Sequence, residues 1–108
     1  MTDVWGALGQ ALPTATTLTD IYTVPAAKHA TVEVVSCNTG IAATIRVSHA
    51  IGGAADAAKQ YMLYDFPLAA ADTKVTARFT MSAGDKLRAY ASTATVAFNV
   101  NGIEETAT

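Results

Sequence analysis

The residues that could carry catalysis or bind a metal are few and isolated from one another. His29 and His49 fall on different expected elements, and neither has a second His or Cys at the spacing of metal ligands. Ser48 and His49 are neighbours on an expected strand, so their side chains point to opposite faces and cannot form a nucleophile–base pair. We therefore expect no metal site, no cofactor and no catalytic His.

The carboxylates, the thiol and the glycines offer no better starting point. Asp65 and Asp72 could approach each other, but a small domain has little cleft for general acid–base catalysis, and aspartates beside turns usually cap them. The single cysteine, Cys37, cannot form an internal disulfide and is expected as a small buried side chain. Gly6 and Gly9 lack the remaining glycines of a phosphate-binding loop. The sequence predicts no enzymatic activity.

Composition excludes several further classes. The chain has 108 residues, of which 51% are hydrophobic and 15% charged, so we expect one folded domain rather than a disordered chain. The formal net charge is -2, and the cations are scattered from Lys28 to Arg88, so no basic stripe predicts nucleic-acid binding. No apolar run is long enough for a membrane helix, and the first residues do not read as a signal peptide. We therefore expect synthesis in a cytoplasm, with no membrane partner.

Hydrophobic residues alternate with polar ones along most of the chain, which is typical of half-buried strands. In residues 73–81 the predicted inward set is Val75, Ala77, Phe79 and Met81, and a second such set is Val96, Phe98 and Val100. Ile45, Val47 and His49 alternate with polar neighbours in the same way. Seven strands are expected near 18–24, 31–38, 43–50, 59–67, 73–81, 86–92 and 95–104.

This pattern predicts an all-β fold, an antiparallel β-sandwich of about seven strands with jelly-roll or Ig-like connections. The sandwich is expected over residues 18–104, with a polar tail at 105–108. Residues 1–17 are expected to form an N-terminal arm, because their large apolar residues have a helix-like spacing that glycines interrupt. Those apolar residues are Trp5, Leu8 and Leu12.

The expected strand at 59–67 is apolar on both sides, which is unusual for a small sandwich. Met62, Tyr64 and Phe66 fall on one side, and Tyr61 and Leu63 fall on the other. Something should cover the second face: either a neighbouring subunit or the arm of the same chain. Exposed aromatic platforms for glycans are a third alternative. The interface candidates are Trp5, Leu8, Leu12, Tyr61, Met62, Tyr64 and Phe66.

Three stretches, at residues 8–26, 59–68 and 82–104, resemble small virion proteins of tailed bacteriophages. The most specific segments are ATTLTDIYTVP at residues 15–25 and NGIEE at residues 101–105. The resemblance implies a β-sandwich or jelly-roll module on the phage particle, as a capsid decoration (cement) protein or as a tail, baseplate or fibre component. It supplies no functional residues.

From the resemblance we expect a structural virion protein, most simply a decoration protein on the capsid exterior that clamps neighbouring major capsid subunits. Its partners would be the major capsid protein or other virion proteins, together with copies of itself in a homo-oligomer, for which a trimer is favoured. A tail or baseplate module and a host-glycan-binding module are the alternatives.

Overall fold

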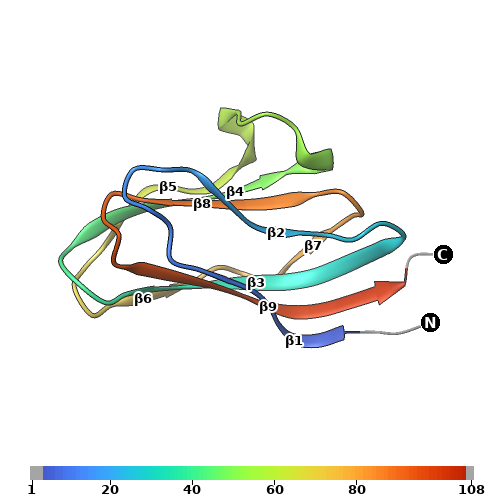
Figure 1. The fold of residues 1–108 in the computed structure, drawn as a ribbon, viewed down its shortest axis with the longest axis horizontal. Helices are drawn as coiled ribbons and strands as arrows, with labels where there is room; N and C mark the ends of the chain where they lie inside the picture. The colour runs from blue at the N-terminus through green and yellow to red at the C-terminus, as the bar shows by residue number, and fades with distance from the viewer. Residues whose placement is uncertain (1–3, 107–108) are drawn as a thin grey trace.

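The computed structural model describes residues 4–106, in which nine strands form two antiparallel sheets packed face to face (Figure 1). Sheet A contains β1 (Val4–Ala11), β3 (Lys28–Asn38), β6 (Thr73–Val75), β7 (Phe79–Met81) and β9 (Val96–Thr106). Sheet B contains β2 (Thr19–Thr23), β4 (Ala43–Ala50), β5 (Tyr61–Leu68) and β8 (Lys86–Ala91). The 3-10 turns η1 (Ile51–Gly53) and η2 (Ala58–Gln60) lie between β4 and β5. Within residues 4–106, no helix has the length and apolar character to cross a membrane.

The core lies between the two sheets, because each strand turns its apolar alternate residues inward. In the long β3–β9 ladder the fully buried apolar side chains are Ala30, Val32, Val34, Val96, Phe98 and Val100. Sheet B supplies Ile45, Val47, Leu87, Ala89 and Ala91 to the same cluster. The all-β class is confirmed, as is the predicted inward set Val96, Phe98 and Val100. At 43–50 Ile45 and Val47 are buried as predicted, but the phase shifts after Val47, so that Ser48 is buried and His49 is only half-buried.

Residues 4–11 of the expected N-terminal arm form a strand of sheet A: β1 pairs along its length with β9. Its register shifts between Ala7 and Gly9, so Leu8 is an extra residue that interrupts the two-residue alternation. This bulge explains why the segment resembles a weak helix in sequence. Gly9 is also required sterically, because a Cβ there would lie 2.5 Å from the carbonyl oxygen of Ile21. Residues 1–3 lie outside the described residues.

The predicted polar tail at 105–108 also begins within a strand. β9 continues to Thr106, where Glu105 and Thr106 pair with His29 and Lys28 of β3. Alternation ends before this point, because Gly102 and Ile103 are both only half-buried. Residues 107 and 108 lie outside the described residues.

The single strand expected at 73–81 is two strands, β6 and β7, joined by an irregular segment. Val75 pairs with Val35, whereas Phe79 pairs with Val32, so β3 has one residue fewer over this interval. In the gap, Thr76 bonds to β3 with its side chain: the Val34 N–H donates to Thr76 Oγ1 at 3.0 Å. The prediction that Val75 and Ala77 point inward was therefore wrong, since both are exposed.

Candidate functional site

Two of the predicted interface residues, Trp5 and Tyr64, lie on the two opposite outer faces of the sandwich. Trp5 lies beside polar alternate residues of β3 and β9, such as Glu33 and Asn101, on the outer face of sheet A. Tyr64 lies beside Arg46 of β4, on the outer face of sheet B. The N-terminal segment therefore does not cover β5, because β1 pairs with β9 in the other sheet.

On the outer face of sheet A, Trp5 is the most exposed large apolar side chain of the described residues, at 76%. It pairs with Ile103 and borders a hollow of about 190 Å³. The rest of the lining is Thr31, Glu33, Arg78, Asn101 and Gly102. Leu12, just beyond β1, is 61% exposed, whereas Leu8 is half-buried and packs against the core.

On the outer face of sheet B, a bulge in the edge strand β5 sets the geometry. Ile45 pairs with Phe66 and Val47 pairs with Leu63, so both Tyr64 and Asp65 stand opposite Arg46. The bulge requires Asp65 to adopt φ 49°, in the left-handed region that non-glycine residues seldom occupy. Tyr64 is left 60% exposed, while Phe66 and Leu63 pack against the core. Met62 is 37% exposed at the edge of the sandwich.

Around this bulge lies an Arg46 cluster, made of Arg46, Tyr61, Tyr64, Asp65 and Tyr90. The guanidinium carbon of Arg46 lies 4.4 Å from the ring centroids of both Tyr64 and Tyr90, which come from the strands on either side of β4. Its Nε donates to Asp65 Oδ1 at 2.6 Å, and this bond raises the pKa of Arg46. The rings of Tyr61 and Tyr64 meet edge to face, with centroids 5.0 Å apart.

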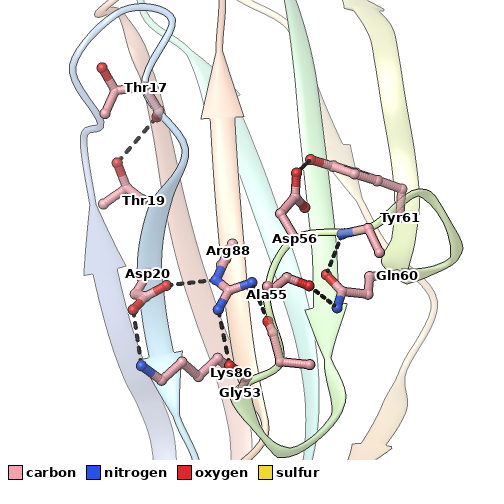
Figure 2. Close-up of polar contacts among 12 residues, drawn as sticks. Thr17, Thr19, Asp20, Gly53, Ala55, Asp56, Gln60, Tyr61, Lys86 and Arg88 are labelled. Carbon is pink, nitrogen blue, oxygen red and sulfur yellow. Dashed lines mark hydrogen bonds and ion pairs between the residues drawn. The ribbon is translucent and has the colours of Figure 1, made fainter.

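The loop formed by residues 51–60 lies over the outer face of sheet B (Figure 1). Arg88 of β8 donates to the carbonyl oxygens of Ala54 at 2.8 Å and Gly53 at 3.3 Å, and its Nε donates to Asp20 (Figure 2). Gln60 is buried, and its Nε2 donates to the Ala55 carbonyl at 2.9 Å. The loop is therefore held to the sheet by directed hydrogen bonds.

Tyr61 joins the loop to the Arg46 cluster. Its hydroxyl donates to Asp56 Oδ2 at 2.9 Å (Figure 2). Burial and this hydrogen bond both raise the pKa of Tyr61. The side of the cluster facing the loop is therefore fixed in position.

His49 takes part in a second polar group, at the other end of the same loop. Its Nε2 lies 2.8 Å from Asp85 Oδ2. Asp85 also accepts hydrogen bonds from the Gly52 N–H at 2.8 Å and the Ser82 N–H at 3.0 Å. A cavity of about 380 Å³ adjoins His49, lined further by Ile51, Ala54, Lys59 and Gln60.

This His49–Asp85 pair is built to hold turns together. The described residues lining the cavity include no hydroxyl or thiol that His49 could activate as a nucleophile. Asp85 instead ties the Ser82–Asp85 turn to Gly52 and to β4 through three donors.

Asp85 should make the fold sensitive to acid. Burial alone would raise the pKa of Asp85, but the hydrogen bonds from Gly52, His49 and Ser82 outweigh it and lower the pKa. A lowered folded-state pKa contributes stability above the unfolded value of about 3.9, and that contribution is lost as the pH falls through the folded value. We expect the free energy of unfolding to decrease below about pH 4.

The matched substitution is Asp85→Asn, which places an amide NH₂ where backbone donors need an acceptor. We expect it to cost about 1–3 kcal/mol at neutral pH and to flatten the acid dependence. Asp20→Asn is the control, because Asp20 is exposed and its pairs with Arg88 and Lys86 should contribute about 1 kcal/mol or less. Urea unfolding of the three proteins between pH 2 and 7 measures both effects. If the free energy of unfolding of Asp85→Asn fell with decreasing pH as steeply as that of the wild type, Asp85 would not be the source of the acid sensitivity.

The remaining titratable candidates are separated from one another. Asp65 pairs with Arg46, whereas Asp72 Oδ1 accepts from the Thr73 N–H, so the two aspartates do not form a pair. Within residues 4–106, no three His, Cys, Asp or Glu side chains gather as a metal site would require. Cys37 is half-buried rather than buried.

One buried polar contact joins the two sheets. The Tyr22 hydroxyl of β2 donates to Glu104 Oε2 of β9 at 2.5 Å. Burial, reinforced by this carboxylate, raises the pKa of Tyr22, so the phenol keeps its proton. The contact satisfies both groups inside the sandwich and has a structural role.

Comparisons of the chain with models of protein families, with curated proteins and with solved structures find no match. Two exposed groups remain as candidate sites: Trp5 on the outer face of sheet A, and the Arg46 cluster on the outer face of sheet B.

Proposed function

We propose that this chain is a structural virion protein, a capsid decoration protein that attaches to major capsid subunits through the outer face of sheet A. The observation that carries the proposal is Trp5, which is 76% exposed although it is held on a strand of the sheet. Tryptophan dominates binding energy at many protein interfaces, and a residue whose backbone is already held in a strand loses no backbone freedom when it binds. A tail or baseplate position would use the same surface.

The strand order supports a jelly roll as the detailed fold. If β6 and β7 count as one interrupted strand, each sheet has four strands, in the orders β1–β9–β3–β6 and β2–β8–β4–β5. The first four strands also alternate between the sheets. This arrangement agrees with an eight-stranded jelly roll, an architecture that viral capsid domains and lectins use. Because one fold serves many functions, the role itself depends on the surfaces.

Trp5→Ser should leave the domain folded and weaken its attachment to phage heads about 30-fold or more, which corresponds to about 2 kcal/mol. A substitution is preferable to deleting the segment, because removing β1 would expose the edge of β9. The measurement is co-sedimentation of the isolated protein with undecorated shells of the phage that encodes it.

Ile51→Ser is the matched control, since Ile51 is 74% exposed but lies on the loop over sheet B. Equal binding of Trp5→Ser and the wild type would contradict attachment through this face. Quantitative mass spectrometry of separated heads and tails tests the location: a decoration protein should be abundant in heads, and enrichment in tails would favour the tail alternative. Sedimentation equilibrium tests the proposed homo-oligomer, for which a trimer is favoured.

A further inference from the structure

The Arg46 cluster presents one exposed aromatic ring surrounded by unused hydrogen-bonding groups. Tyr64 is 60% exposed; the Arg46 guanidinium lies over its ring, and the ring of Tyr61 meets it at 82°. Among residues 4–106, the terminal guanidinium nitrogens of Arg46 and the second carboxylate oxygen of Asp65 have no hydrogen-bond partner. Donors and an acceptor therefore lie beside an aromatic ring that is largely exposed to solvent.

The arrangement is fixed before any ligand arrives. Asp65 is held at φ 49° by the β5 bulge, and its carboxylate fixes the Nε of Arg46 at 2.6 Å. Tyr61 is tied to the loop through Asp56, as Figure 2 shows. Unfavourable backbone conformations of this kind occur most often at binding sites and other functional positions, where the surrounding structure maintains them.

The charges of the cluster favour a neutral ligand. Arg46 is already paired with Asp65, and Asp56 adds a further carboxylate nearby, so an anion would gain little net attraction. A group that both donates and accepts hydrogen bonds fits the mixture of guanidinium, carboxylate and phenol better. Hydroxyl groups have this property.

The extent of the apolar surface favours a small ligand over a protein partner. A stable protein interface buries about 800 Å² on each side around an apolar centre. Here the exposed Tyr64 ring contacts Arg46 and Tyr61, Asp65 lies next to it on the bulge, and the loop at residues 51–60 is joined to Tyr61 through Asp56. A site with one apolar platform and several convergent polar groups is typical of small-molecule recognition.

We propose that the Arg46 cluster binds a neutral saccharide. The apolar C–H face of a pyranose ring stacks on the exposed face of Tyr64, and its hydroxyls pair with the terminal nitrogens of Arg46 and the free oxygen of Asp65. The site lies on the face of the sandwich opposite Trp5, so a particle bound through sheet A leaves it facing outward. The saccharide proposal does not depend on that attachment.

The test uses the isolated full-length protein and saturation-transfer NMR, with maltohexaose, cellohexaose, chitohexaose and mannohexaose as neutral probes. We expect at least one probe to bind with millimolar affinity or better. Tyr64→Ala should weaken that binding at least ten-fold, and Arg46→Lys should weaken it too, because lysine lacks the planar pair of donors. Tyr64→Phe should retain it, since stacking needs only the ring.

Trp5→Ala is the control and should bind the probe as the wild type does, because Trp5 lies on the opposite face. Thermal melts establish that each variant is folded. Absence of binding by all four probes would overturn the proposal, as would binding that survives Tyr64→Ala. Binding of hexagalacturonate alone would overturn the neutral class, and loss of shell attachment in Tyr64→Ala without any saccharide binding would assign this face to a protein partner.

Discussion

Replacing Phe98 by alanine is expected to lower the free energy of unfolding by about 3–5 kcal/mol. Phe98 is fully buried and is the largest such side chain in the described residues. It lies in β9, between β1 and β3, and faces the residues of sheet B across the core. Removing the ring leaves a cavity that a two-sheet core cannot close without moving a whole strand.

Substitutions at two adjacent residues, Phe79 and Arg78, provide smaller expected losses of stability for comparison. Phe79→Ala should cost less, about 1–3 kcal/mol, because Phe79 is only half-buried where β7 joins the edge of sheet A. Arg78→Ala should cost under about 1 kcal/mol, since Arg78 is exposed. Urea unfolding followed by circular dichroism measures all three. If Arg78→Ala cost as much as Phe98→Ala, the side of residues 78–79 that carries Arg78, and not the side that carries Phe79, would face the core.

Six of the seven strands that sequence reasoning located exist within a few residues, because burial on one face imposes a period of two on most of them; the strand expected at 73–81 is instead the two strands β6 and β7. β4 and β9 are the clearest examples, with Ile45, Val47, Phe98 and Val100 all buried. The pattern fails where an extra residue enters a strand. Leu8 in β1 and the segment between Val75 and Phe79 shift the phase by one, and no single-residue signal marks such a shift.

The candidate sites could be predicted only in part, for a similar reason. Trp5 and Tyr64 are apolar residues at positions where a small sandwich has little room for them, so their exposure follows from composition and pattern. Arg46 has no such signal, because it occupies an ordinary outward position on β4. It acquires two aromatic neighbours only through the strand order and the β5 bulge. The pairing of His49 with Asp85 likewise depends on how separate turns meet.

Gly102→Ala is expected to destabilise the domain by about 3 kcal/mol or more, even though it adds a single methyl group. A Cβ at Gly102 would lie 2.0 Å from the carbonyl oxygen of Thr31 and 2.8 Å from the Cα of Val32. Both are backbone atoms of β3, the strand with which β9 forms its longest ladder. No side-chain rotation can relieve this clash, so the ladder itself must open.

Asn101→Ala is the control, because Asn101 is the preceding residue of β9 and is half-buried on the outer face of sheet A. It changes the same strand without placing an atom against β3, and we expect an effect of about 0.5 kcal/mol or less. Urea unfolding should therefore separate the two variants widely. Amide hydrogen exchange should also show faster exchange at Val32 and its neighbours in Gly102→Ala, because local opening of the β3–β9 ladder exposes their N–H groups. Equal stability of the two variants would mean that β3 and β9 lie farther apart at Gly102 than the structure has them.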